Sequence, residues 1–214
     1  MFATAARPTL LIVLAGGVAL SGIIGPGICE AADSSQLAII LDIRGKLAGG
    51  VEESMRAEAA RILEIPDLEI AWRLLDGETH QETFERIVMV RLAGACTARP
   101  AGLRTAAAQP LGFTHISNGV ILPFAEIDCD LLRCMIRGAA IPQHAKERER
   151  LLGRALGRVL AHEVYHIIAR TTEHSRDGVA SEAFRPSDLT CANFRLDGHC
   201  LGKLMAAVSA QAPN

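Results

Sequence analysis

The chain has 214 residues, of which 50% are apolar and 21% are charged. That is enough material for one ordinary hydrophobic core and too little to expect two. The formal net charge is -2, and Lys and Arg are scattered along the chain rather than clustered, so the composition argues against a nucleic-acid partner.

The first 32 residues have the order of an export signal. Arg7 precedes an apolar run from Leu10 to Leu20, and small residues follow as far as position 32. This order predicts a secretory signal peptide, with cleavage favoured after Ala31, and hence a secreted or periplasmic protein. The alternative is an uncleaved membrane anchor, because the stretch 8–25 is nearly long enough to span a bilayer.

Five of the six cysteines lie beyond that segment, and their pairing stays open at this stage. In an oxidising compartment the short spacings favour two disulfides, Cys129 with Cys134 and Cys191 with Cys200, which would leave Cys96 as a free thiol. Spacing alone cannot fix the connectivity. Some of these residues are equally well explained as buried apolar thiols.

Residues 33–214 are expected to form a single domain that begins with alternating strand and helix patterns. Leu37 to Ile43 is apolar and β-branched, which predicts a buried strand. From Val51 to Leu63 the apolar residues recur at helical spacing. Leu68 to Leu75 and Phe84 to Leu92 are then strand candidates, because β-branched residues and alternation return.

The second half of the domain is predicted to contain a hairpin and one long helix. Ala98 to Gly112 has the composition of a loop, and in His115 to Ile127 the dipeptide Asn118-Gly119 favours a hairpin turn. After an irregular stretch, Lys146 to Arg170 has the strongest helical pattern of the chain. These elements predict an α+β fold with a mixed sheet of about four to five strands, backed by two main helices.

The long helix carries the motif HExxH, formed by His162, Glu163 and His166. Residues four apart lie on the same face of a helix, about 5–6 Å apart at their Cβ atoms, so the two imidazoles can bind one Zn²⁺. Glu163 is then placed to act as the general base toward a water molecule that the metal activates. These polar groups interrupt an apolar stripe, where burial without a metal would be costly.

A catalytic zinc site needs a third protein ligand, and three residues are candidates. His174 is the first choice, because it follows His166 after a segment that can end the helix and turn the chain back. Glu182 is the main rival, as a carboxylate from a later element. His199 is a more distant alternative.

An HExxH motif followed closely by another histidine resembles the metzincin zinc peptidases. Three segments are similar to those of small, predicted exported bacterial proteins with a reduced metzincin-like site: Gly153 to His166, His174 to Gly178, and Phe184 to Leu189. The resemblance implies a zincin-like fold, with His162, His166 and His174 as zinc ligands and Glu163 as the base.

The chain departs from the metzincin pattern at four positions. Ala169 stands where metzincins have a glycine, and His174 falls two residues later than their third ligand. Ala180 stands where the small relatives usually have the methionine of a supporting turn, and Tyr165 stands where a glycine is frequent. These changes leave metal binding expected and disfavour efficient turnover.

The expected function is zinc-dependent hydrolysis of peptide bonds in a peptide or protein substrate, with an unidentified donor to the oxyanion. His115, Tyr165 and Arg170 are candidate donors, although ordinary packing or surface roles explain each of them better. The hairpin from His115 to Phe124 offers a strand edge to an extended peptide. The alternative is an exported zinc-binding or interaction module whose peptidase site has degenerated, which the missing methionine favours and Glu163 disfavours.

Overall fold

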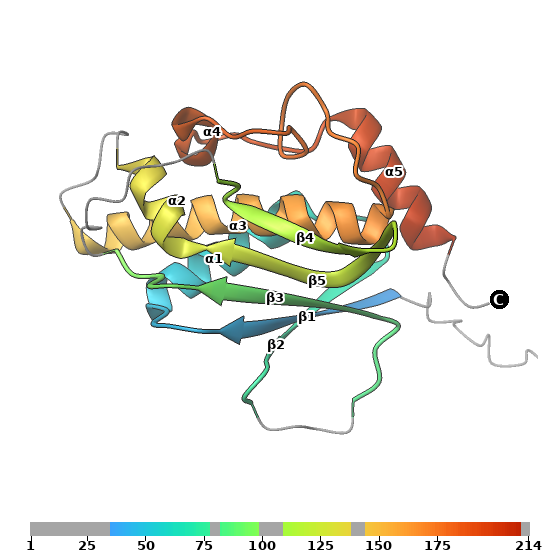
Figure 1. The fold of residues 1–214 in the computed structure, drawn as a ribbon, viewed down its shortest axis with the longest axis horizontal. Helices are drawn as coiled ribbons and strands as arrows, with labels where there is room; N and C mark the ends of the chain where they lie inside the picture. Colours follow the sequence, from blue (N-terminus) through green and yellow to red (C-terminus); the bar gives the residue numbers. More distant parts are fainter. Residues whose placement is uncertain (1–34, 78–81, 99–108, 138–143, 211–214) are drawn as a thin grey trace, which may run out of the picture. The chain divides into compact units, whose positions relative to one another are not determined.

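The computed structural model describes residues 35–77, 82–98, 109–137 and 144–210, which form a layered α+β domain (Figure 1). The strands are β1 (Ser35–Ile43), β2 (Leu68–Leu74), β3 (Arg86–Ala93), β4 (Gly112–Ser117) and β5 (Val120–Asp128). The helices are α1 (Gly49–Ile62), α2 (Cys129–Ile136), α3 (Ala145–Ala169), α4 (Pro186–Thr190) and α5 (Gly198–Ser209).

The five strands form one mixed sheet in the order β2-β1-β3-β5-β4. Four strands, β2, β1, β3 and β5, run parallel to one another. The fifth strand, β4, pairs with β5 in the antiparallel direction. The tight turn of this hairpin is Asn118-Gly119, and both residues have positive φ, 51° and 77°. The predicted α+β class, the mixed five-stranded sheet and the hairpin are therefore confirmed, and β4 is placed at one edge of the sheet.

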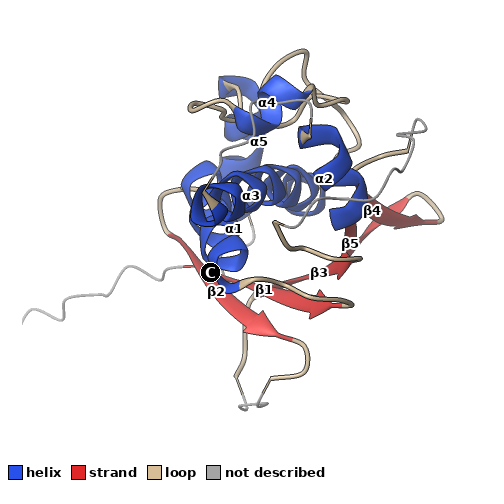
Figure 2. Cartoon of the chain, turned by 90° about the vertical axis from the view of Figure 1, so that its left-hand side faces the viewer, coloured by secondary structure: helices blue, strands red, loops and turns tan. Residues whose placement is uncertain are grey.

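Helices α1 and α3 cover one face of the sheet (Figures 1 and 2). Side chains of a strand alternate between its two faces, and the residues that point toward these helices are large and apolar. The fully buried members from the two central strands are Leu37, Ile39, Leu41, Val88, Val90 and Leu92. Helix α4 lies on the side of α3 away from the sheet, so α3 is buried between two layers.

Two glycines on α3 allow it to approach α1 closely. A Cβ at Gly153 would lie 2.5 Å from the carbonyl oxygen of Val51, and one at Gly157 would lie 2.6 Å from that of Met55. Backbone atoms cannot move away cheaply, so only glycine fits at either position. The close contact fixes the position of α3, and with it the position of the side chains on its C-terminal half.

A buried arginine ties α3 to the C-terminal segment. Arg158 is fully buried and donates to Glu58 on α1 and to the carbonyl oxygens of Asp188 and Cys191. Its guanidinium also lies over the ring of Phe194, 5.2 Å from the ring centre. A buried charge of this kind is tolerated because its donors are satisfied, and its removal would leave Glu58 partly unpaired.

The predicted disulfides are wrong. Cys96 pairs with Cys129, with Cα atoms 5.1 Å apart, so Cys96 is not free and Cys129 does not pair with Cys134. Cys191 and Cys200 both have free thiols, so the second predicted disulfide is not formed either. Cys96 follows β3 and Cys129 opens α2, and the parallel pairing of β3 with β5 brings these two chain positions together.

The remaining predictions differ from the structure mainly after β5. The stretch expected to be irregular contains α2, whose N-terminus is capped by the Asp128 side chain, which accepts from the backbone N–H groups of Asp130 and Leu131. Helices α4 and α5 were also not predicted. The proposed signal peptide at 1–32 and most of the loop at 98–112 lie outside the described residues. No helix in the described part of the chain has the length and apolar character needed to cross a bilayer.

Candidate metal centre

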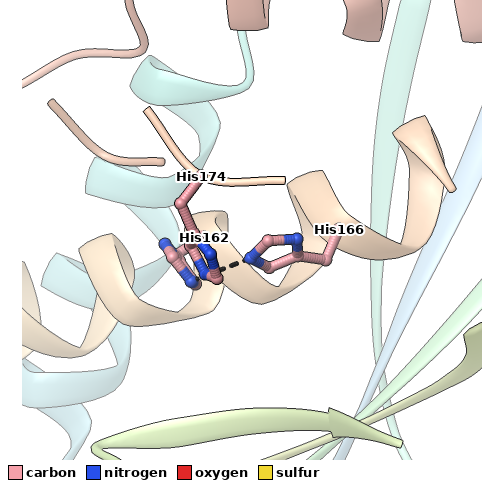
Figure 3. Close-up of side chains that lie close together, drawn as sticks. All are labelled: His162, His166 and His174. Atoms are coloured by element: carbon pink, nitrogen blue, oxygen red, sulfur yellow. Dashed lines mark hydrogen bonds between the residues drawn. The ribbon is translucent and has the colours of Figure 1, made fainter. Parts of the chain in front are cut away.

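The C-terminal half of α3 brings two buried histidines to one point. His162 and His166 are each 7% exposed, and their Nε2 atoms lie 3.0 Å apart (Figure 3). Two nitrogens bound at about 2.0–2.1 Å to one tetrahedral ion would lie about 3.3 Å apart. The observed separation is therefore close to what a shared cation requires.

The other nitrogen of each ring is held by a main-chain carbonyl. His162 Nδ1 lies 2.7 Å from the carbonyl oxygen of Val179, and His166 Nδ1 lies 2.7 Å from that of Thr171. A carbonyl oxygen only accepts, so both Nδ1 atoms carry the proton and, in the neutral rings, both Nε2 atoms present a lone pair. Such outer hydrogen bonds orient metal-binding histidines and raise their basicity.

The third imidazole of the group belongs to His174, which lies after α3 and is exposed. Its ring centre lies 5.4 Å from that of His162 and 4.8 Å from that of His166 (Figure 3). One nitrogen from each of the three rings lies within 4.8 Å of the other two. Glu182 lines the same cavity but is not part of this group, and His199 is exposed on α5.

A short hydrogen-bonded loop supports the histidines from the C-terminal side. The N–H of Ser175 donates to the carbonyl of Ala180 at 2.8 Å, and the N–H of Val179 donates to the carbonyl of Arg195 at 2.9 Å. The second bond holds Val179, the residue whose carbonyl oxygen accepts from His162. Through Arg195 and the neighbouring Phe194, this loop is connected to the side of α3 where Arg158 is buried.

An aromatic ring contacts His162 in this region, where the resemblance implied a methionine. Phe184 lies edge-on to His162 with ring centres 5.4 Å apart, and it packs against Phe194 at 5.8 Å. Ala180 is fully buried and supplies backbone rather than a thioether. Apolar support beneath the histidines is thus present in a different form.

Electrostatics keep the helix histidines in the form that binds a metal. Burial lowers the pKa of His162 to about 4, against the opposing hydrogen bond to Val179 and assisted by the nearby His166 and His174. Burial also lowers the pKa of His166. Both rings are therefore neutral at pH 7, and three imidazoles with free nitrogens around one point can bind a metal ion.

Glu163 lies on the same helix and lines the same cavity as the three histidines. Its carboxylate is 3% exposed, and its Oε2 accepts a hydrogen bond from Thr114 Oγ1 of β4 at 2.7 Å. Burial raises the pKa of Glu163 to about 7, although the Thr114 hydrogen bond acts in the opposite direction. A carboxylate with this pKa can both accept and return a proton near neutral pH.

The site opens into a cavity of about 280 Å³ between α3 and the β4–β5 hairpin. One wall is apolar and comes mainly from the hairpin: Pro110, Phe113, Ile116 and Ile121. The opposite side carries Thr171, Thr172 and Glu182 near the histidines. The edge strand of the sheet therefore runs directly past the candidate metal centre.

The three candidate oxyanion donors do not line this cavity. His115 lines a separate cavity of about 190 Å³ on the sheet face that α1 and α3 leave uncovered. Tyr165 is 1% exposed, and burial raises its pKa while its hydroxyl hydrogen-bonds with Cys200. Arg170 is exposed and ends α3 in the left-handed conformation. Their positions agree with packing and surface roles.

Sequence reasoning found the three histidines and Glu163 but missed what holds them. Thr114 gave no signal, because a single threonine in a strand does not show which side chain of a covering helix it contacts. Val179 and Thr171 act through their carbonyl oxygens, which every residue has, so residue type carries no trace of this role.

No protein-family model matches this chain, and no curated protein is similar to it.

Proposed function

We propose that this protein is a zinc-dependent endopeptidase with a zincin-like active site. The observation that carries the proposal is the group of His162, His166 and His174 around one point, with Glu163 in the same cavity. Three protein ligands and an open side toward a cavity are typical of catalytic zinc sites, whereas structural zinc sites usually close with four protein ligands.

The donor set favours zinc over harder cations. Neutral imidazole nitrogens suit zinc and other late transition metals, whereas magnesium and calcium prefer oxygen ligands. When bound, zinc supplies a Lewis acid that polarises a carbonyl group and lowers the pKa of a water molecule toward about 7.

Glu163 supplies the proton transfer in the proposed reaction. Its carboxylate takes a proton from the attacking water and later delivers that proton to the amine that leaves the cleaved peptide bond. Before a metal binds, burial raises the pKa of Glu163 to about 7, which favours a carboxylate that readily accepts a proton. Burial keeps the carboxylate out of bulk water, where its pKa would fall back toward the ordinary value.

The edge strand supports a peptide as the substrate. Strand β4 ends the sheet, and it pairs with β5 on one side. Its residues Gly112, Phe113 and Thr114 line the cavity beside the histidines. An extended peptide can add to such an edge through main-chain hydrogen bonds, which would bring a peptide bond past the metal centre.

Export of the protein remains part of the proposal. The Cys96–Cys129 disulfide supports it, because disulfides form and persist mainly in oxidising compartments such as the periplasm or the extracellular space.

The decisive experiment compares wild type with Glu163→Gln for zinc content and for cleavage of an unfolded protein. We expect one zinc per chain in both, and loss of cleavage in the variant by about a hundredfold or more. The matched control is Glu147→Gln, which changes an exposed glutamate on the same helix. This variant should cleave the substrate as fast as wild type does.

The same experiment separates the second candidate function, an exported zinc-binding or interaction module with a degenerate site. Ala180 in place of a supporting methionine is the observation in its favour. Zinc bound by wild type without cleavage of any unfolded protein would favour the module over the peptidase.

A further inference from the structure

Two residues of the edge strand face the proposed base from across the cavity. Gly112 and Thr114 are two apart in β4, so they share one face of the strand. That face is directed at α3, because the Cβ position of Gly112 lies near Val159 and the Thr114 side chain contacts Glu163.

Thr114 holds one oxygen of the Glu163 carboxylate. Its hydroxyl donates to Oε2 at 2.7 Å and lies 3.4 Å from the Glu163 carbonyl oxygen. A buried carboxylate is costly to leave without a donor, so this bond strongly favours one orientation of the side chain.

Gly112 leaves room for the other oxygen. A Cβ at this position would lie 2.9 Å from Glu163 Oε1, 2.9 Å from Val159 Cγ1 and 3.2 Å from the carbonyl oxygen of Glu126. The first two distances are shorter than real Cβ contacts, so any larger residue would displace the carboxylate or the strand.

We propose that Gly112 and Thr114 form a seat that orients Glu163 for proton transfer. Thr114 occupies Oε2, and the missing side chain at Gly112 keeps Oε1 accessible from the cavity. The two carboxylate oxygens thus have separate tasks, one anchored and one free to exchange a proton. Both strand residues are positioning residues, since they act through Glu163. The inference rests on the proposed function for its catalytic consequence.

The anchoring itself can be measured without metal and without activity. Thr114→Val removes the hydroxyl and keeps the shape of the side chain. In the metal-stripped protein we expect Thr114→Val to lower the melting temperature by about 3 °C or more. In a Glu163→Met background, which has no carboxylate to hold, the same substitution should change the melting temperature by clearly less.

The catalytic consequence is measured in the zinc-loaded protein. Thr114→Val should lower kcat by about tenfold to a hundredfold with little change in KM, because a misdirected base slows the chemical step rather than binding. Thr114→Ser keeps the donor and should restore most of the rate. Gly112→Ala should also lower kcat.

Two substitutions serve as matched controls. Thr83→Val changes an exposed threonine, and Gly202→Ala adds a Cβ on α5 that meets no atom within 4 Å. Neither control should lower kcat, and neither should show an effect on the melting temperature that depends on Glu163.

The outcomes separate this inference from the proposed function. The inference is wrong if Thr114→Val lowers the melting temperature equally in the wild-type and Glu163→Met backgrounds. It is also wrong if Thr114→Val keeps the wild-type kcat in a protein whose cleavage requires Glu163. Coupling between Thr114 and Glu163 in a protein that cleaves no peptide would support the seat and overturn the peptidase.

Discussion

Helix α3 and the loop that follows it contribute ligands to the same point in different ways. His162 and His166 are buried on a regular helix that is packed between α1 and the C-terminal segment. His174 is exposed on a loop held by a few backbone hydrogen bonds. The helix therefore presents a preformed pair of imidazoles, whereas the third imidazole depends on a loop that is held in place from several directions.

The difference indicates where the site is rigid and where it depends on distant contacts. The helix pair is fixed by local geometry, because residues four apart share a helix face. The loop position is fixed by Val179, Arg195 and the buried Arg158, which are far apart in sequence. The predictions below test this contrast, from the largest expected effect to the smallest.

Arg158→Met should produce the largest loss of stability. The substitution leaves the partly buried Glu58 with one partner fewer and removes the guanidinium donor from two carbonyl oxygens, and breaking a buried pair typically costs about 3–5 kcal/mol. We expect the melting temperature to fall by about 10 °C. Arg150→Met, on the exposed side of the same helix, is the control and should change it by little.

In the metal-free protein, His162 should contribute a loss of stability as the pH falls from about 6.5 to 4. Burial depresses the pKa of folded His162 to about 4, whereas the unfolded chain takes up the proton near 6.5. At this residue the unfolded state thus binds more protons in this window, so His162 contributes a loss of roughly 3 kcal/mol as the pH decreases. The raised pKa of Glu163 acts in the opposite direction, so the His162 contribution is read from the difference between wild type and His162→Gln. Urea unfolding of wild type and His162→Gln checks this, and an identical slope in the variant would contradict it.

Loss of a helix histidine should weaken zinc binding more than loss of the loop histidine. His166→Asn removes a preformed ligand, and we expect an affinity loss of about a hundredfold or more. His174→Asn should cost about tenfold, because ordering the loop already offsets part of what its imidazole contributes. Competition titration with a zinc chelator measures both. A larger loss of zinc affinity for His174→Asn than for His166→Asn would show that the loop histidine contributes more to binding than the helix histidine.

The smallest effect is expected at the loop surface. Glu173 precedes His174 and forms an ion pair with Lys203 of α5. Exposed ion pairs contribute little and are screened by salt. Glu173→Gln should lower zinc affinity by less than about threefold at low salt and leave it unchanged at 0.5 M salt. A loss that persists at high salt would mean that the pair holds the loop by geometry rather than by charge.

Local patterns predicted a large part of the fold. Periodicity located α1, α3 and the strands, and Asn118-Gly119 identified the hairpin because few other residue pairs accept two positive φ angles. The HExxH spacing identified the two helix histidines and Glu163. The order of the strands was not predicted, because it depends on how the connections cross the sheet.

The remaining features depend on contacts between distant segments or on signals that went unused. Cys96 and Cys129 are 33 residues apart and meet only once the sheet has formed. Helix α5, by contrast, has an Asp197 cap whose side chain accepts from the N–H of Cys200, and a capping pattern of this type can be recognised in a sequence. The seat at Gly112 and Thr114 has no local signature at all.

Main-chain carbonyls at Thr171 and Val179 hold the two helix imidazoles. Insertions and deletions should therefore disrupt these two hydrogen bonds more readily than substitutions do. A saturation mutagenesis map would show broad tolerance at the half-buried Thr171, since every amino acid offers the same oxygen, whereas at the fully buried Val179 it would report side-chain packing rather than this hydrogen bond. Removing one residue between His166 and Val179 would move the carbonyl oxygen of Val179 away from its position beside His162. A conventional scan of substitutions would therefore overlook two of the contacts that orient the site.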